Sequence, residues 1–252
     1  MRKLTVLAFV LFFVAAGTQA AQDKLVHKSA RLDANGRLSL ELHNGSVTIA
    51  TWSRPDVDIQ ARVEAVYEVS QSDVNSTEIR VSGSGPSVDI TTDYSAINGW
   101  GLGIFNWGTT PPVHYTISMP ASAQVKVTAH NASVKVTGLH NDVDVDTHNG
   151  PVTVADLDGA ARIETHNGGV RVSYSRFGKA ARIETHNGSV DVHLPQSAAF
   201  HIDAEGHHLS FDSDFPATTH GYESSHYTGD VNGGGPSLRI TTHNGSVRVR
   251  KS

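Results

Sequence analysis

The sequence predicts an all-β protein, built as a single-stranded parallel β-helix (β-solenoid) with about 18–20 residues per coil. The first observation is a His-Asn-Gly motif that recurs with at most one change, at His43, His130, His148, His166, His186 and His243. The second is its spacing, because the four central histidines are 18, 18 and 20 residues apart. The third is the strict alternation of apolar and polar residues around each motif, which is the period of a β-strand with one buried face.

Residues 1–20 have the layout of a secretory signal peptide. Arg2 and Lys3 precede an apolar run of 13 residues, Leu4 to Ala16, and small residues follow up to Ala20. This run is short for a membrane span, which needs about 20 residues, although an uncleaved anchor is the alternative. We therefore expect an exported chain with no transmembrane segment after cleavage. The periplasm is favoured over the cell surface, because no anchor or sorting signal is visible.

The charge and the cysteine count narrow the classes of partner. Loss of Arg2 and Lys3 with the signal peptide would leave 18 basic residues against 25 acidic ones, a net charge of −7. A mildly acidic chain without a basic cluster is a poor candidate for binding nucleic acid. The chain has no cysteine, so that no disulfide can stabilise the fold.

Residues 24–92 are expected to form N-terminal strands. Leu38, Leu40 and Leu42 lead into the His43 motif, so this segment predicts one copy of the repeat ahead of the main stack. Val57 to Val63 alternates in the same way and predicts a further strand.

Residues 93–112 interrupt the pattern with a loop rich in glycine and aromatic residues. Trp100, Phe105 and Trp107 stand among glycines in this segment. One interpretation is a loop that covers the open end of the solenoid, as repeat proteins require. The other is an exposed contact site for a glycan, a lipid surface or a protein, with these three residues as its candidates.

Residues 113–252 are expected to form the main repeat stack, within a single domain over residues 21–252. Each unit reads as a strand, an Asn-Gly turn and a second strand. The inward positions before the turn are Val143, Val145 and Thr147, then Ala161, Ile163 and Thr165, then Ala181, Ile183 and Thr185, and finally Leu238, Ile240 and Thr242. The pairs after the turn are Val134/Val136, Val152/Val154, Val170/Val172, Val190/Val192 and Val247/Val249.

Stacked coils and a meander of hairpins are the two ways to arrange these units, since Asn-Gly is also a hairpin signal. About five aliphatic side chains per unit stabilise by ~1.5–3 kcal/mol each, against ~1–2 kcal/mol of backbone entropy per ordered residue. One unit cannot stand alone, and the identical register favours stacking. The interval from His186 to His243 is 57 residues, which predicts two intervening coils without the motif. Ile202 and Leu209 lie 19 residues after Ile183 and Val190 and are expected to align with them.

In a stack, the motif histidines form a column along one edge. One interpretation is structural, with Asn amides bonded along the column and the imidazoles shielding the corner. The other is weak Zn²⁺ or Cu²⁺ binding by His130, His148, His166 and His186, with like-charge repulsion lowering the pKa of these imidazoles. No other cofactor is expected.

Catalysis is the least favoured reading. Asp142, Asp144 and Asp146 with Arg162 resemble the carboxylates and basic residue of β-helical enzymes that cleave acidic polysaccharides. However, they occupy regular repeat columns, with charge pairs such as Arg162 to Glu184 expected between coils. No catalytic residue is predicted.

The chain resembles the bacterial putative-adhesin family of β-strand-repeat envelope proteins. The resemblance rests on Gly45-Ser-Val-Thr-Ile49 followed by Trp52, on Tyr115-Thr-Ile-Ser-Met-Pro120, on the tandem Thr-His-Asn-Gly units, and on the ending Val231 to Val247. It implies a β-helical envelope protein without defined catalytic residues. The sequence therefore predicts an exported, non-catalytic binding or structural module whose partner is an envelope component, glycan or protein.

Overall fold

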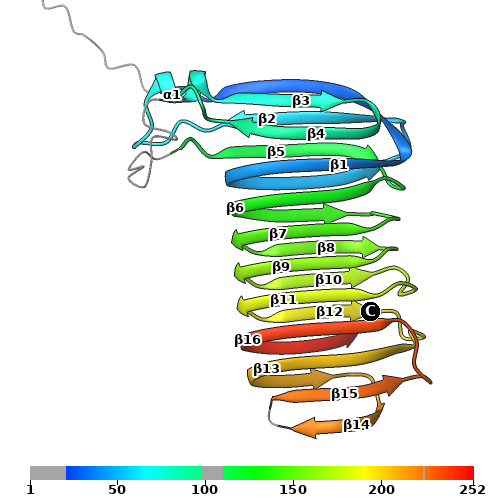
Figure 1. The fold of residues 1–252 in the computed structure, drawn as a ribbon. Coiled ribbons are helices and arrows are strands. Elements are labelled where there is room, and N and C mark those ends of the chain that lie inside the picture. Colours follow the sequence, from blue (N-terminus) through cyan, green and yellow to red (C-terminus); the bar gives the residue numbers. More distant parts are fainter. Residues whose placement is uncertain (1–20, 98–109, 224) are drawn as a thin grey trace, which may run out of the picture.

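The computed structural model describes residues 21–97, 110–223 and 225–252. Sixteen strands in this part of the chain join one sheet, and the only helix has six residues, so the all-β prediction is confirmed (Figure 1). The elements are β1 (Lys24–Trp52), β2 (Asp56–Val63), α1 (Gln71–Ser76), β3 (Glu78–Gly83), β4 (Gly85–Asp93), β5 (Val113–Pro120), β6 (Gln124–Thr137), β7 (Val143–Asn149), β8 (Val152–Leu157), β9 (Ala161–Asn167), β10 (Val170–Tyr174), β11 (Ala181–Asn187), β12 (Val190–Leu194), β13 (Phe200–Ser213), β14 (Ala217–Glu223), β15 (His226–Val231) and β16 (Ser237–Lys251).

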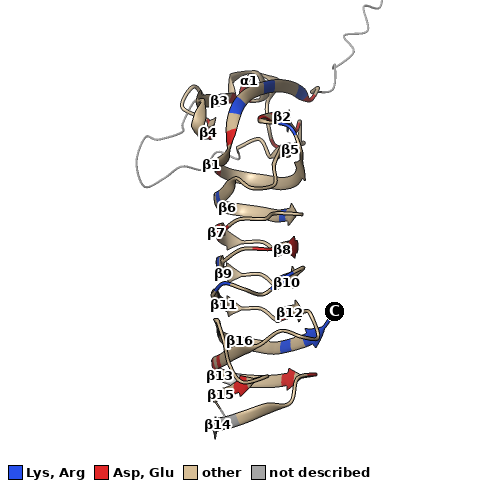
Figure 2. Ribbon diagram, turned by 90° about the vertical axis from the view of Figure 1, so that its right-hand side faces the viewer, with Lys and Arg blue, Asp and Glu red and all other residues tan. Residues whose placement is uncertain are grey.

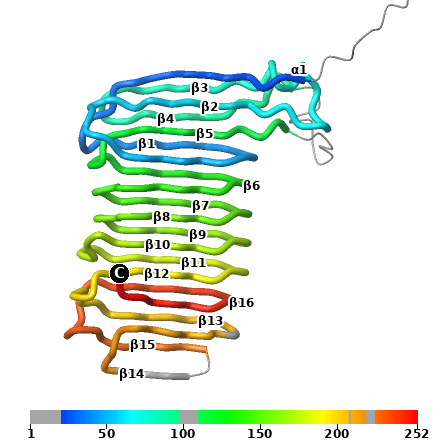
Figure 3. Tube along the Cα trace, turned by 180° about the vertical axis from the view of Figure 1, so that it is seen from behind, coloured from blue at the N-terminus to red at the C-terminus, as the bar shows by residue number. Residues whose placement is uncertain are grey.

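Successive repeats lie on one another in parallel rather than side by side as hairpins. β7 pairs with the first half of β6 and with β9, whereas β8 pairs with the second half of β6 and with β10. The two strands of one unit therefore belong to opposite faces of a flattened coil, with the Asn-Gly turn at the edge between them (Figure 3). The meander of hairpins is excluded for these repeats.

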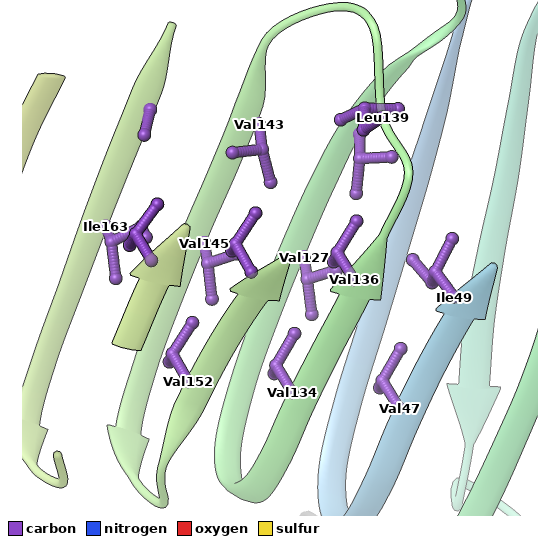
Figure 4. Close-up of a cluster of buried hydrophobic side chains, with 14 of the residues drawn as sticks. Val47, Ile49, Val127, Val134, Val136, Leu139, Val143, Val145, Val152 and Ile163 are labelled. Carbon is purple, nitrogen blue, oxygen red and sulfur yellow. The ribbon is translucent and has the colours of Figure 1, made fainter. Parts of the chain in front are cut away.

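The core is a set of aliphatic columns between the two faces. Val145 pairs in register with Val127 on one side and Ile163 on the other, and Ile163 pairs with Ile183. All four side chains are at most 1% exposed, and Figure 4 shows the valines of both faces pointing into the same interior. Each coil buries its apolar side chains against two neighbouring coils. This burial offsets the loss of backbone conformational entropy on folding, which a single coil could not do alone.

Glycine and threonine make the turns fit this close stacking. A Cβ atom added to Gly168 would lie 2.1 Å from the carbonyl oxygen of Gly150 in the preceding coil. The buried Thr165 hydroxyl donates to the same oxygen at 3.4 Å, and Thr185 donates to the Gly168 oxygen at 3.1 Å. Glycine therefore suits this position because of close backbone approach as well as turn geometry, and the repeat at His130 has the small residue Ala132 there, in register with Gly45.

The N-terminal end adds one more coil above the His43 repeat. β4 pairs in parallel with the first face of β1, and β5 pairs in parallel with its second face. The connection between them, residues 94–112, leaves β4 at the edge where the other coils carry the Asn-Gly turn. Trp100, Phe105 and Trp107 lie outside the described residues. β2 and β3 then pair antiparallel with β5 and β4.

The prediction for the interval between His186 and His243 is wrong. β16, which carries His243, pairs directly with β11 and β12, and no coil lies between them (Figure 1). Residues 200–213 stack beyond β16, followed by β15 and β14 in antiparallel pairing. A Cβ atom at Gly245 would lie 2.0 Å from the Gly188 oxygen, whereas β13 has Leu209 at the equivalent position. β16, and not β13, therefore carries the glycine that Gly150, Gly168 and Gly188 supply in the preceding coils.

The predicted register of residues 200–213 is also shifted. Ala204, not Ile202, pairs with Ile240 and so aligns with Ile183; likewise Phe211, not Leu209, pairs with Val247 and so aligns with Val190. The spacing rule fails here because the chain passes through β13 before it returns to fill the coil below β12.

The predicted signal peptide, residues 1–20, lies outside the described residues. Within the described part, α1 is far too short to cross a membrane, and no other helix could do so.

Candidate functional site

The face formed by the first strand of each coil displays three columns of outward side chains. The register pairs Lys126 with Asp144, Arg162, Arg182 and Arg239 in the first column. The second column, two residues further along each strand, contains Thr128, Asp146, Glu164, Glu184 and Thr241. The motif histidines form the third column, beside the turns. Figure 2 shows charged segments succeeding one another along the stack from β6 to β16.

The histidine column is a continuous stack of six imidazole rings. Ring centroids from His43 through His130, His148, His166, His186 and His243 are 5.0, 5.0, 4.8, 4.7 and 4.5 Å apart, with planes within 8° of parallel. His207 of β13 continues it in a tilted arrangement, 5.2 Å from His243. The predicted candidates His130, His148, His166 and His186 are thus brought together, and His43, His207 and His243 extend the column at both ends.

An asparagine ladder holds the turns beside these rings. From Asn131 onward, each side-chain amide donates to the side-chain oxygen of the asparagine in the preceding coil, at 2.7–2.9 Å, whereas Asn44 at the start donates to Thr110 Oγ1 at 2.7 Å. The members are Asn44, Asn131, Asn149, Asn167, Asn187 and Asn244. The asparagine bonds expected along the column are therefore present, and they link the turns that carry the histidines.

A groove of about 880 Å³ runs along the stack between the imidazoles and the acidic column. His130 to His243 line one side of it, and Asp146, Glu164, Glu184 and Glu205 line the other. Threonines such as Thr147 and Thr165 form the floor. The groove therefore offers carboxylates and imidazole edges at the repeat spacing, about 4.8 Å between neighbouring strands.

Most carboxylates of the second column form ion pairs with arginines of the first column. Arg162 lies 3.8 Å from Glu164 and 3.9 Å from Asp144, and Arg182 contacts Glu184. These pairs lie within a strand or between adjacent strands, in place of the diagonal Arg162 to Glu184 pair expected from the sequence. Asp146 takes part in no ion pair with another described residue, so its carboxylate is the one open to a ligand.

Two histidines at opposite parts of the column have shifted pKa values. Partial burial lowers the pKa of His43, and the neighbouring His130 lowers it further. The pKa of His186 is also lowered, mainly by desolvation and in addition by the neighbouring His243 and His166. Like-charge repulsion was the only cause expected from the sequence, and it is the second cause at both positions.

The metal candidates do not form a ready coordination site. Among the described residues, no three His, Asp or Glu side chains converge as metal ligands. The rings stand in line, and their faces cover one another. Metal binding by the column stays a prediction.

Two of the three carboxylates considered for catalysis, Asp142 and Asp144, have structural partners. Asp142 pairs with Lys179 at 2.7 Å and accepts the Ala160 amide at 3.0 Å, and Asp144 lies near Arg162. The Lys179 contact and the Ala160 amide bond lower the pKa of Asp142, although desolvation, the largest influence, acts in the opposite direction. The Ala160 bond joins neighbouring coils, and the Lys179 contact reaches across two repeats.

Two histidine clusters were missed by the sequence analysis. His114 contacts the Ser46 hydroxyl through Nδ1 at 2.8 Å and donates from Nε2 to the Glu64 carboxylate at 2.7 Å. These bonds join β1, β5 and the residue after β2. At the other end, His201 contacts Asp230 at 2.8 Å, and His226 contacts Asp203 at 2.9 Å. Only the fold brings these partners together, because the Ser46–His114 and His114–Glu64 pairs are 68 and 50 residues apart.

The Ser46–His114–Glu64 series differs from a hydrolase triad. In the triad the serine is bonded to Nε2 and the carboxylate to Nδ1, whereas the two nitrogens are exchanged here. Ser46 also lies inside a strand that pairs with β5 and β6. We interpret these two contacts as a structural link between the strands of the N-terminal region.

Comparison with known proteins identifies the family. Residues 33–250 match the family described as Toastrack DUF4097. The chain belongs to this family. The Toastrack match covers the His43 repeat, the whole stack and nearly all of β16. It confirms the resemblance to the putative-adhesin family drawn from the repeats. No curated protein sequence matches the chain.

Three solved structures resemble this Toastrack chain. A putative cell adhesion protein from Clostridium sporogenes ATCC 15579 has a TM-score of 0.52 at 13% identity, over 91% of this chain and 100% of that one. Putative adhesins from Bacteroides fragilis NCTC 9343 and Parabacteroides distasonis ATCC 8503 have TM-scores of 0.36 and 0.31 at 11% and 12% identity, over 92% and 90% of this chain and 99% and 98% of theirs. The first similarity supports the fold, and the other two are too distant to add to it.

Proposed function

We propose that this chain is an exported, non-catalytic, adhesin-like module of the bacterial cell envelope, built as a single-chain β-solenoid over residues 21–252. In this proposal residues 1–20 are removed as a signal peptide and the mature chain works in the periplasm. The observation that carries the proposal is the repeat-lined groove, whose columns present the same few side chains coil after coil. Such a surface suits an extended partner rather than the chemistry of one substrate bond.

The regularity of the groove favours binding over catalysis. A catalytic centre needs a non-repeating group of side chains held around one reacting atom. In the groove, by contrast, the acidic and imidazole side chains of one coil recur in the next. The similar fold of the putative cell adhesion protein from Clostridium sporogenes supports an adhesin-like role.

The predicted partner is an envelope glycan or protein that lies along the stack. Its contacts are proposed to be the groove carboxylates, of which Asp146 has no ion pair within the described chain, and the loop residues Trp100, Phe105 and Trp107. The described strands on either side of the aromatic segment, β4 and β5, meet the edge of the stack that carries the motif turns, and we propose that one partner contacts both the segment and the groove.

Retention of isolated envelope material tests this proposal. The immobilised chain is incubated, with EDTA present, with purified cell-wall glycan and with solubilised envelope proteins. We expect one fraction to be retained, and a groove variant (Asp146→Asn with Glu164→Gln) or a loop variant (Trp100→Ala with Trp107→Ala) to lose it. The matched control is Thr153→Ala with Arg171→Ala on the opposite face. Equal retention by all variants, or none by the parent chain, would contradict the proposal.

Cell fractionation tests the location. The chain expressed with residues 1–20 should appear in the periplasmic fraction, shortened at its N-terminus and protected from protease added outside. A chain found at full length in the cytoplasm would contradict export, and one degraded by external protease would contradict the periplasm.

A further inference from the structure

The spacing of the histidine column sets what it can bind. Two rings stacked 4.8 Å apart, as His148 and His166 are, use their faces on each other and so leave only their edges for a ligand, and both residues line the groove. A tetrahedral Zn²⁺ with Zn–N bonds of about 2.0–2.1 Å would hold two imidazole nitrogens about 3.4 Å apart. The two edges therefore need to tilt together by roughly 1.4 Å, which the broad χ2 torsion of histidine permits.

A carboxylate accompanies these imidazoles in the central coils. Asp146 precedes His148 by two residues, and Glu164 precedes His166 by two, so that each pair lies on the same face of its strand. The separation along the strand is roughly 6.6 Å, within reach of two flexible side chains that lean toward one point. Two neighbouring coils thus supply two imidazoles and two carboxylates, a full tetrahedral set.

We propose that this face holds a divalent transition-metal ion between neighbouring coils, with His148, His166 and Asp146 as its first ligands and Glu164 as the fourth. Imidazole together with carboxylate suits Zn²⁺ and Cu²⁺ better than Mg²⁺ or Ca²⁺, which prefer oxygen ligands alone. The ion is held by rings that tilt out of the parallel stack.

Arginines compete with the metal ion for the carboxylates, and this competition determines which pair of coils binds the ion best. His166 and His186 also have two carboxylates beside them, Glu164 and Glu184, but both acids contact arginines. Asp146 is in no ion pair among the described residues, so binding there breaks fewer contacts. The pair His130 and His148 has only Asp146, because Thr128 replaces the second acid.

Sharing of ligands limits the stoichiometry. Each ion uses two neighbouring rings, and in this proposal each ring serves one ion. The six stacked histidines therefore accept at most three ions, at His43/His130, His148/His166 and His186/His243. The outer pairs have one acidic neighbour each, Glu41 and Glu184, and should bind more weakly.

Titration calorimetry with ZnCl₂ on the full chain, carrying no histidine tag, tests the site. We expect one tighter event followed by weaker ones, with no more than three ions in total. Loss of even an outer-shell partner of a metal ligand typically weakens binding tenfold or more, so Asp146→Asn and His166→Gln should each raise the Kd of the first event at least about tenfold. Both replacements are close in shape, and far-UV circular dichroism checks that the variants fold.

The matched control is His193→Gln. Asp191 and His193 repeat the two-residue spacing on the opposite face, but the in-register neighbours of His193 are Ser173 and Arg250 instead of histidines. Its replacement should leave the first Kd unchanged. Cu²⁺ electron paramagnetic resonance gives an independent readout, with coupling to two imidazole nitrogens expected in the parent chain and lost in His148→Gln with His166→Gln.

Three results would overturn the proposal: equal Zn²⁺ uptake by the parent chain and the double variant, an equal loss in His193→Gln, or coupling to a single nitrogen. The envelope-binding experiment above contains EDTA, so a failure of the metal site and a failure of the partner proposal give separate results.

Discussion

Asn167 donates its side-chain amide to the side-chain oxygen of Asn149, 2.8 Å away in the preceding coil, and Asn149 repeats the bond to Asn131 at 2.7 Å. Each asparagine inside this series is both donor and acceptor. The ladder therefore couples every turn to two others, and it accompanies the imidazole stack over its whole length from Asn44 to Asn244.

Replacement of Asn149 by alanine should break the ladder at its centre. Two hydrogen bonds are lost, and since the net contribution of one is about 0.5–1.5 kcal/mol, we expect the free energy of unfolding to fall by about 1–2 kcal/mol. Urea denaturation followed by circular dichroism measures this change. Lys135→Ala, at an exposed position on the second strand of the preceding coil, serves as control, and an equal loss in both variants would show that the ladder contributes nothing of its own.

Truncation of Ile163 tests the shared interior. Its side chain is 1% exposed and lies in register between Val145 and Ile183. Ile163→Ala should lower the free energy of unfolding by about 2–5 kcal/mol, because the cavity is bounded by coils that cannot collapse independently. The same denaturation experiment on Arg162→Ala, one residue away and pointing outward, should show a change within about 0.5 kcal/mol. Similar losses at both positions would contradict the assigned inward and outward faces.

Stability should fall as the pH is lowered from 7.5 to 5.5. The pKa values of His43 and His186 are below the usual 6.5 in the folded chain, so the unfolded chain binds more protons in this window. The stability contributed by the neutral imidazoles is complete above pH 6.5 and is lost as the pH falls through that value toward the lowered folded values. The carboxylates with shifted pKa values titrate below this window, since theirs are lowered from 3.8.

Unfolding midpoints in urea at several pH values measure this dependence. His43→Gln and His186→Gln should each flatten it, because glutamine does not titrate. His140→Gln, an exposed histidine outside the column, should keep the slope of the parent chain. An unchanged slope in the first two variants would exclude the column as its origin.

The repeat spacing was enough to predict the parallel register of the central coils. The ring stack, the inward columns and the charge columns of β6 to β11 all follow from aligning His-Asn-Gly, since each residue of a coil contacts its own counterpart. The order of the last coils could not be predicted in this way. Counting residues assumes that chain order equals spatial order, whereas β16 passes back to lie against β12.

The histidine clusters outside the column were also beyond prediction from the sequence. His114 obtains Ser46 and Glu64 through β1–β5 and β2–β5 pairing, and these elements lie outside the regular repeats. No periodic signal connects such residues. Their partners depend on how the N-terminal strands close the stack, which composition and spacing leave open.

The strongest test of the stacking is a methyl group at a motif glycine. In Gly168→Ala the new Cβ would lie 2.1 Å from the Gly150 oxygen, and that oxygen belongs to the backbone of a paired coil that cannot move aside. Overpacking of a rigid interior typically costs about 1–3 kcal/mol and occasionally more, so we expect the free energy of unfolding to fall by about 3 kcal/mol.

Gly178 offers the matched control, because a Cβ there meets no atom within 4 Å. Gly178→Ala should therefore be neutral or stabilise by up to about 1 kcal/mol, through the lower entropy of the unfolded chain. Thermal and urea denaturation compare the two variants directly. If both tolerate alanine equally, the coils are not in the close backbone contact on which the asparagine ladder and the imidazole stack depend.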